Sequence, residues 1–513
     1  MMGARMERDM RQQLFEHYEK LSFSYYDQNN SGQMMSKLVS DLFDISEFAH
    51  HGPENLFISV IKIVGSFTFL FLINWRLAIP LLVMVVCMLF FSYGQNRQMQ
   101  TTFMDNRKKI GDVNSSLQDT LSGIRVVQSF ANEEIEREKF MESNENFLIS
   151  KNANYHCMGS FMSGNLFFQG MMYLITLVFG GWLIARGKMD VADLAMYALY
   201  IGIFISPIQI LVELTEMMQK GLSGFRRFLD VVETEPEIVN ASDAEPLQNV
   251  KGEVEYEHVS FHYSDDDTLV LDNVSFKIPA GKSIALVGPS GSGKTTICSM
   301  LPRFYDVTSG DITLDGVDIR EVKQHELREK LGYVPQKGVL FSGDIASNIM
   351  FGNSHGSDDE MIEAAEIAQA TEFIDTKPEK YKSTISQGGS NVSGGQKQRL
   401  SIARAIAKRP QVFIFDDSFS ALDYKTDVTL RRALAEKTSG STVLIVAQRI
   451  STILHAEQII VLDEGKVAGK GTHAELLKNC PVYREIAESQ LSRKELEAAL
   501  NEQTDGKEDQ IHG

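Results

Sequence analysis

The chain has 513 residues, a formal net charge of −18 at pH 7 and four cysteines. Its length exceeds one domain and predicts about two to four. The acidic balance disfavours nucleic acid as a partner, because surfaces that bind nucleic acid are basic. The cysteines are widely spaced and form no C-x-x-C pair, so they predict reduced thiols instead of a metal site or a disulfide framework.

Long apolar runs dominate the first part of the chain. They cover residues 56–73, 77–93, 166–185 and 194–212. Each run is near the ~20 residues that cross a bilayer, and the last three carry no charge. Lys62 interrupts the first run, and it either faces a cavity or snorkels or pairs at the membrane edge. Residues 1–230 are therefore predicted to form a helical transmembrane domain in contact with the lipid bilayer.

The loops between these runs differ in charge. The link over 94–165 carries eight Lys and Arg residues and the segment before the first run carries five, whereas the links 74–76 and 186–193 hold only Arg76, Arg186 and Lys188. By the positive-inside rule, the long link, both termini and everything after residue 212 face the cytoplasm. We expect a multi-pass protein of the cell (plasma) membrane.

The composition changes after the last run. Residues 231–250 are rich in Glu, Asp and Pro and are predicted to be a linker. Residues 251–488 alternate between patterns typical of strands and of helices, and residues 489–513 form a polar tail. The second domain is predicted to be α/β.

The segment Gly288–Thr295 fits the pattern G-x-x-x-x-G-K-[ST] without a mismatch. It lies between a short apolar strand (283–287) and the start of a helix, where backbone N–H groups and the helix N-terminus cradle phosphates. Lys294 is expected on the β- and γ-phosphates and Thr295 on Mg²⁺. A Gly/Ser turn with a chance lysine is disfavoured by this context. The predicted nucleotide-binding residues here are Gly288, Pro289, Ser290, Gly291, Ser292, Gly293, Lys294, Thr295 and Thr296.

Further candidates flank this loop. Tyr263 either stacks on a base or simply packs; Gln336 follows a strand and is placed near the metal; Ser393, Gly394, Gly395 and Gln396 open a helix as a second anion cradle. The apolar strand 412–415 delivers Asp416 and Asp417, which suit a Mg²⁺ ligand and a base that polarises water. A surface pair of aspartates is the alternative. Asp423 and Gln448 come next along the chain.

In this order and spacing, the motifs resemble those of an ATP-binding-cassette (ABC) exporter half-transporter. Tyr263 resembles the residue of the adenine-stacking loop, Gly288–Thr295 resembles Walker A, and Gln336 resembles the Q-loop glutamine. Further along, Ser393–Gln396 resembles the signature, residues 413–416 resemble Walker B, and residues 420–423 resemble the D-loop. The resemblance implies an all-α transmembrane bundle followed by a P-loop NTPase domain that binds ATP and Mg²⁺. It further implies that two such domains meet head to tail, and that segments near 25–32 and 119–130 are coupling helices.

The chain departs from that family's pattern in its ATP site. Asp417 stands where glutamate is usual and Gln448 where histidine is usual; Gln387 replaces a glutamate before the signature and Val392 a leucine. By resemblance, Asp417, Gln448 and Asp423 are the catalytic candidates, and Thr295, Gln336 and Asp416 the metal candidates. These losses predict the degenerate half of a heterodimeric exporter, whose partner is a second half-transporter. The four spans, against six in the family, predict that the first span and most of the second are missing.

The resulting expectation is ATP-driven export of a hydrophobic or amphipathic small molecule, drug-like or lipid-like. A nucleotide-sensing regulatory or channel subunit, and a slow homodimeric exporter, are the alternatives.

Overall fold

The computed structural model describes residues 2–244, 246–247, 249–263, 268–438, 440–454, 456–491 and 496. The chain divides into two compact units, Met1–Glu19 with Ser31–Thr234 and Lys20–Asn30 with Glu235–Gly513. The stretch Lys20–Asn30 therefore belongs by its contacts to the second unit, although segments of the first unit flank it in sequence. Most of the predicted tail, 489–513, lies outside the described residues.

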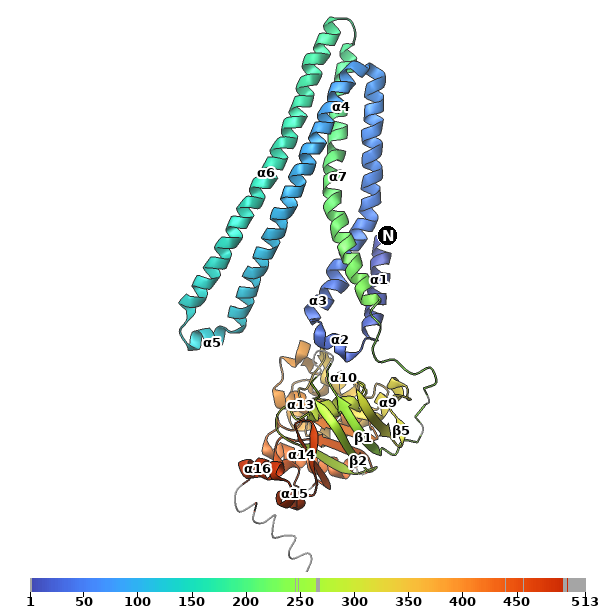
Figure 1. Ribbon diagram of the computed structural model, residues 1–513, viewed down its shortest axis with the longest axis vertical. Coiled ribbons are helices and arrows are strands. Elements are labelled where there is room, and N and C mark those ends of the chain that lie inside the picture. Colours follow the sequence, from blue (N-terminus) through green and yellow to red (C-terminus); the bar gives the residue numbers. More distant parts are fainter. Residues whose placement is uncertain are drawn as a thin grey trace, which may run out of the picture. The chain divides into compact units, whose positions relative to one another are not determined.

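The first unit is all helical, as predicted (Figure 1). Its elements are α1 (Met2–Tyr18), α3 (Ser31–Ser36), a π-helical turn (Lys37–Asp41), α4 (Leu42–Ser122), α5 (Ile124–Ser129), α6 (Glu133–Ala185) and α7 (Val191–Val232). Among the described residues, three helical stretches are long and apolar enough to cross a membrane: Ser31–Ser122, Glu133–Ala185 and Val191–Val232.

One of these stretches contains two of the predicted spans. Helix α4 runs through both 56–73 and 77–93, but Asn74 leaves helical geometry with φ −156° and ψ 95°. The Asn74 side chain is buried and donates a hydrogen bond to the Lys188 carbonyl at 2.9 Å, in the turn between α6 and α7. Because a helix carrying such a break turns sharply, α4 is two packed helices joined at Asn74.

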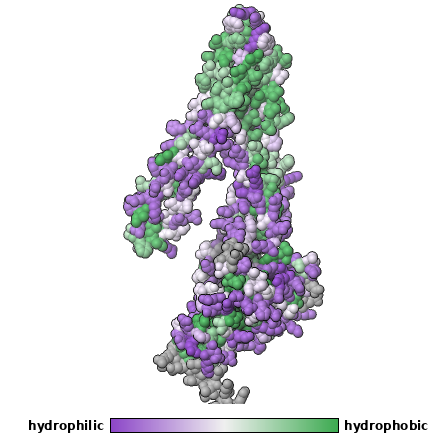
Figure 2. All heavy atoms as spheres, viewed as in Figure 1, coloured by the Kyte–Doolittle hydropathy of each residue, from purple (hydrophilic) through white to green (hydrophobic). Residues whose placement is uncertain are grey.

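The membrane-facing character of this unit is visible in its exposed side chains. Leu70, Leu77 and Leu81 are fully buried among α4, α6 and α7, yet Leu72 is 80% exposed and Phe90 is 75% exposed. Hydrophobic surface gathers on the upper part of the helical unit in the view of Figure 2, just below its tip. Apolar surface of this extent fits lipid or other transmembrane helices.

The second unit is α/β and is built on two main sheets. The larger has the order β12-β11-β3-β10-β9-β6, and the smaller, antiparallel, the order β2-β1-β4-β5. The strands of the larger are β3 (Ser283–Val287), β6 (Leu331–Val334), β9 (Val412–Asp416), β10 (Thr442–Val446), β11 (Gln458–Asp463) and β12 (Lys466–Gly471); those of the smaller are β1 (Val254–Phe261), β2 (Leu271–Ile278), β4 (Ser309–Leu314) and β5 (Val317–Asp318). A short pair, β7 (Gly343–Asp344) and β8 (Thr384–Ile385), completes the strands of the described chain.

Helices surround these sheets. They are α2 (Phe23–Gln28), α8 (Lys294–Met300), α9 (Gln324–Lys330), α10 (Ile345–Met350), α11 (Asp358–Ile367), α12 (Thr371–Asp375), α13 (Gly394–Ala407), α14 (Tyr424–Lys437), α15 (His473–Asn479) and α16 (Pro481–Gln490). Strands β3, β10 and β9 are parallel neighbours, with Val446 opposite both Leu286 and Asp416. Because the carboxyl ends of parallel strands share one edge of a sheet, the segments that follow them meet there.

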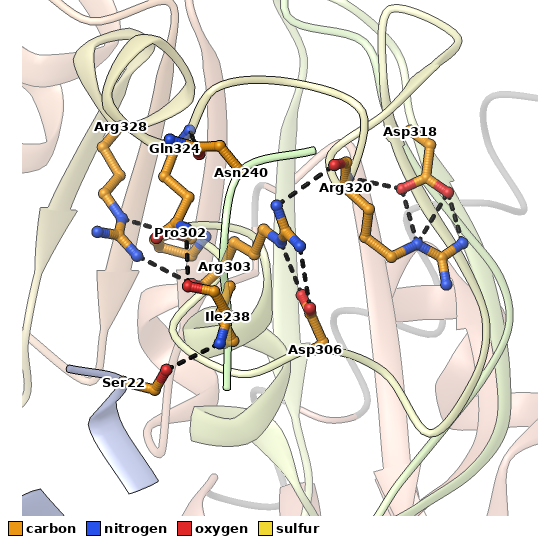
Figure 3. A network of polar contacts seen from close by, with 10 residues as sticks. All are labelled: Ser22, Ile238, Asn240, Pro302, Arg303, Asp306, Asp318, Arg320, Gln324 and Arg328. Atoms are coloured by element: carbon orange, nitrogen blue, oxygen red, sulfur yellow. Dashed lines mark hydrogen bonds and ion pairs between the residues drawn. The ribbon is translucent and has the colours of Figure 1, made fainter. Parts of the chain in front are cut away.

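The predicted linker over 231–250 is attached to the second unit. Helix α7 ends at Val232, and the chain then follows an irregular path. Along it, the Ile238 N–H donates to Ser22 Oγ at 2.9 Å, and its carbonyl accepts from Gln324 Nε2 at 3.1 Å. Asn240 Oδ1 accepts from the Gln324 N–H at 2.9 Å (Figure 3). Hydrogen bonds of the backbone thus fix part of a segment that the sequence presents as a simple connector.

Candidate nucleotide and metal site

The P-loop leaves β3 and enters α8 through two glycines that admit no side chain. At Gly288, an added Cβ would lie 2.1 Å from the Leu462 carbonyl oxygen. Gly293 has φ +95°, and its Cβ would lie 2.6 Å from Leu271 Cδ2. Glycine tolerates positive φ, and it has no side chain to clash with these close neighbours. The loop backbone can therefore curl around an anion.

Lys294 occupies the centre of this loop. Its Nζ donates to the carbonyls of Gly288 at 2.9 Å and Pro289 at 2.6 Å, and to Ser292 Oγ at 3.2 Å. Burial lowers the pKa of Lys294, while the carboxylates of Asp417 and Asp416 favour its charged form. Within the described part of the chain, the hydrogen-bond partners of the ammonium group are therefore loop oxygens, which phosphate oxygens of a nucleotide would replace.

A hydroxyl and a carboxylate meet beside the loop. Thr295 Oγ1 donates to Asp416 Oδ1 at 3.0 Å. Asp416, at the end of β9, is 2% exposed; burial raises its pKa and the Thr295 hydrogen bond opposes that shift. Hard oxygen ligands of this kind fit Mg²⁺. Thr295 and Asp416 would hold Mg²⁺ here, and the ion would supply positive charge that stabilises negative charge on a bound phosphate.

Asp417 lies next to this pair and is held by two amides. Its Oδ2 accepts from Gln336 Nε2 at 3.1 Å and from Gln448 Nε2 at 2.8 Å. The residue is 6% exposed and has φ +47°, a conformation uncommon for aspartate. Burial raises the pKa of Asp417, and the Gln336 hydrogen bond lowers it. The structure thus brings Asp417, Gln336 and Gln448 together through these two hydrogen bonds.

Gln448 is positioned from the C-terminal helix of the described chain. Gln490, the last residue of α16, donates through Nε2 to the Gln448 carbonyl at 2.8 Å and accepts at Oε1 from the Ile450 N–H at 2.8 Å. The Gln490 side-chain amide thus donates one hydrogen bond and accepts another, as a backbone peptide group would, and restrains the loop after β10. Sequence reasoning missed Gln490, because only the fold brings residues 448 and 490 together.

Tyr263 lies beside the P-loop helix. Its hydroxyl is 3.1 Å from Thr296 Oγ1. Its ring meets Phe261 and Tyr305 edge-on, with centroid distances of 4.9 and 5.3 Å. The position is compatible with both interpretations of this residue, since the ring packs on the core and also borders the nucleotide loop.

The signature residues occupy a different place. Ser393 caps α13, with its Oγ accepting from the Gln396 N–H at 3.3 Å and its N–H donating to Gln396 Oε1 at 3.1 Å. Ser393 and Gly394 are exposed, and among the described residues no hydrogen bond joins Ser393–Gln396 to Gly288–Thr296.

Asp423 is also apart from the P-loop. Its carboxylate caps α14 and accepts from the Thr426 N–H at 3.0 Å, a hydrogen bond that lowers its pKa. The predicted residues therefore form two groups, one around Lys294 and one at the exposed starts of α13 and α14.

Comparison with known families covers both units. The ABC transporter transmembrane region matches residues 1–208, and the ABC transporter family matches residues 271–420. The chain is 37% identical over 493 residues to the uncharacterized ABC transporter ATP-binding protein YwjA of Bacillus subtilis (strain 168), covering 96% of this chain and 86% of that protein.

Other relatives have more descriptive names. The chain is 32% identical to the ATP-dependent lipid A-core flippase of Syntrophus aciditrophicus (strain SB), over 95% of this chain and 81% of that protein. It is 32% identical to a putative multidrug export ATP-binding/permease protein of Staphylococcus aureus (strain NCTC 8325 / PS 47), over 93% of this chain and 83% of that protein. The solved structure of a bacterial Atm1-family ABC exporter with ATP bound matches with a TM-score of 0.81 and 27% identity, covering 96% of this chain and 86% of that one.

Proposed function

The chain belongs to the ABC transporters, as a transmembrane region fused ahead of an ATPase domain, and on this premise we propose that it is one half of a heterodimeric exporter with a weakly catalytic ATP site of its own. Its family makes it a membrane protein with a cytoplasmic ATPase domain that binds ATP. In this proposal, the chain and a second half-transporter in the plasma membrane contribute unequally to ATP hydrolysis.

The environment of Asp417 is the observation that carries the proposal. A general base must reach the proton it removes, within hydrogen-bond distance of the attacking water. Here the carboxylate is that of an aspartate, one methylene shorter than glutamate, and two amides occupy its Oδ2 at 3.1 and 2.8 Å. Gln448 can donate a hydrogen bond but cannot exchange a proton as histidine does. ATP that is bound with Mg²⁺ by Lys294, Thr295 and Asp416 would therefore be hydrolysed slowly.

The signature is available to another chain. Ser393 and Gly394 are exposed at the N-terminus of α13, a helix of 14 residues that carries partial positive charge there. A hydroxyl and backbone N–H groups in this arrangement stabilise a phosphate. We assign this cradle to the γ-phosphate of ATP held by the partner, with Asp423 approaching the same interface.

The solute is proposed to be hydrophobic or amphipathic. The relatives named above include a lipid A-core flippase and a putative multidrug export protein. Exposed apolar side chains on α4 and α6, such as Phe90 and Val178, would suit such a solute or the lipid that surrounds it.

The test compares ATP hydrolysis by the chain alone with ATP hydrolysis and solute transport by the chain bound to its partner. We expect the purified chain in nanodiscs to bind ATP and to hydrolyse it far more slowly than the assembled transporter. A tagged chain purified from its own membranes should bring down a second half-transporter, and this pair should move a fluorescent amphipathic dye in liposomes. Rapid turnover by the chain alone, with dimers of a single species on sizing, would instead establish a homodimeric exporter. ATP binding by a pair that moves no solute would establish a regulatory subunit.

A further inference from the structure

Helix α2 is seated on the loop that follows the P-loop helix. The Phe23 ring lies over the Phe304 ring, with centroids 4.2 Å apart and an angle of 32°. Next to it, the Tyr305 hydroxyl donates to Asp27 Oδ2 at 2.6 Å. Ser24 Oγ donates to Glu237 Oε2 at 2.6 Å, so α2 also holds the segment after α7. Contacts of Phe23, Ser24 and Asp27 therefore hold α2 in place within the second unit.

Several hydrogen bonds hold the loop that contacts α2. Arg303 is 5% exposed, has φ +55°, and donates to both carboxylate oxygens of Asp306 at 2.8 and 3.0 Å. Arg328 donates to the carbonyls of Pro302 and Arg303 at 3.0 and 2.9 Å (Figure 3). The Arg328 guanidinium also lies 5.5 Å from the centre of the Phe304 ring. A ring fixed on this scaffold passes a displacement on to its neighbours instead of absorbing it.

The neighbour of Phe304 on its inner side is Tyr333. The two rings meet edge-on at 5.5 Å and 88°. Tyr333 lies on β6, opposite Ile414 of the parallel strand β9, and its side chain extends along the strand toward Asp416. The Tyr333 hydroxyl donates to Asp416 Oδ2 at 3.5 Å. A continuous series of contacts thus runs from α2 to the Asp416 carboxylate, the candidate metal ligand.

We propose that Tyr333 is a positioning residue for the metal ligand Asp416, and that the contacts Phe23–Phe304–Tyr333 make the orientation of this carboxylate depend on whether α2 is seated. The inference rests on the proposed Mg²⁺·ATP site, but it does not depend on how fast that site hydrolyses ATP.

The physical basis is the number of restraints on the carboxylate. Thr295 holds Asp416 Oδ1 at 3.0 Å and Tyr333 holds Oδ2. The terminal torsion of an aspartate is soft and has no sharp rotamer wells. With one oxygen released, the carboxylate plane rotates, and a metal must order it again at an entropic cost. Because coupling between binding events is reciprocal, bound metal also favours the seated position of α2.

The experiment measures metal affinity, not turnover. Mn²⁺ serves as a paramagnetic probe for Mg²⁺, and its binding to the full chain in nanodiscs with ATP is followed by electron paramagnetic resonance. Tyr333→Phe removes only the hydroxyl and is expected to weaken Mn²⁺ binding about three- to tenfold, the usual worth of one hydrogen bond. Phe23→Ala is expected to weaken it in the same direction. In the double variant the two effects should be less than additive, because they act through one path.

Matched controls separate positioning from general damage. Tyr483→Phe removes a buried hydroxyl that contacts His473 at 2.7 Å in another core cluster, and Phe351→Ala removes an exposed ring that packs at a tilt against Phe341. Both should leave Mn²⁺ affinity unchanged. Binding of ATP without metal should be unchanged in every variant, which shows that the domain is folded.

Unaltered or tighter Mn²⁺ binding in Tyr333→Phe would refute the positioning role. Additive effects of Phe23→Ala and Tyr333→Phe would refute the connection to α2. Failure of the unsubstituted chain to bind Mn²⁺ with ATP would refute the metal site itself, whereas rapid turnover by the chain alone would refute only the proposed division of labour.

Discussion

Replacing Asp417 by glutamate, together with Gln448→His, should raise ATP turnover at the site that we propose to be weakly catalytic. In the structure, Asp417 Oδ2 accepts hydrogen bonds from the amides of Gln336 and Gln448 at 3.1 and 2.8 Å. One added methylene moves the carboxylate forward by about 1.5 Å, a single C–C bond. The histidine removes one of the two amides and supplies a group that titrates near neutral pH.

The size of the gain follows from geometry. A misplacement of about 1 Å changes the rate of an enzymatic step by about 10²-fold, which equals roughly 2.7 kcal/mol of activation free energy. Loss of the Gln448 amide contact destabilises the fold by about 1 kcal/mol, so the protein should remain folded. We therefore expect ATP turnover of the double variant to exceed that of the unsubstituted chain by about 10- to 100-fold.

Phosphate release by each chain in nanodiscs measures the effect. Asp375→Glu adds the same methylene at an exposed residue paired with Lys380 at 3.2 Å, and should change nothing. If the double variant binds ATP normally but gains no activity, the geometry of Asp417 does not limit the site and the reasoning is wrong.

Three further predictions address the parts around this residue. Lys294→Ala should abolish labelling by a photoreactive ATP analogue, since Lys294 is the ammonium at the centre of the loop; Lys282→Ala, an exposed lysine paired with Glu457 at 3.0 Å, should label normally. Gly288→Ala should also abolish labelling while leaving the circular dichroism spectrum intact, because its methyl group would lie 2.1 Å from the Leu462 oxygen; normal labelling would show that the loop can relax. Gln490→Ala should speed hydrogen exchange of the Ile450 amide about fivefold, the equivalent of one hydrogen bond, and unchanged exchange would show that α16 does not restrain this loop.

Local patterns were sufficient for the elements of the nucleotide site. A P-loop needs glycines and a lysine at fixed spacing, and a buried apolar strand delivers Asp416 and Asp417 to the edge of a sheet, so local patterns alone predict roles for residues 288–296 and 412–417. The family follows from the same motifs and is confirmed by the relatives. The all-helical first unit followed from its apolar runs.

Tertiary contacts were not accessible in that way. No periodicity indicates that Phe23 lies on Phe304, or that β6 is the neighbour of β9 and so places the Tyr333 hydroxyl near Asp416. The break at Asn74 was expected only as a short link, whereas its geometry depends on the hydrogen bond to Lys188, 114 residues away. These features depend on strand order and on side chains from distant segments.

The roles of Ser393 and Asp417 in an assembled transporter test the central claim most directly. In the proposed heterodimer, Ser393→Arg would place bulk and a cation in the exposed cradle at the start of α13, and Asp417→Asn would remove the charge of this chain's own candidate base. We predict that Ser393→Arg nearly abolishes ATP hydrolysis by the pair, whereas Asp417→Asn leaves most of it. If Asp417→Asn proves the more damaging of the two, this chain's own site is catalytic and the proposed division of labour is contradicted.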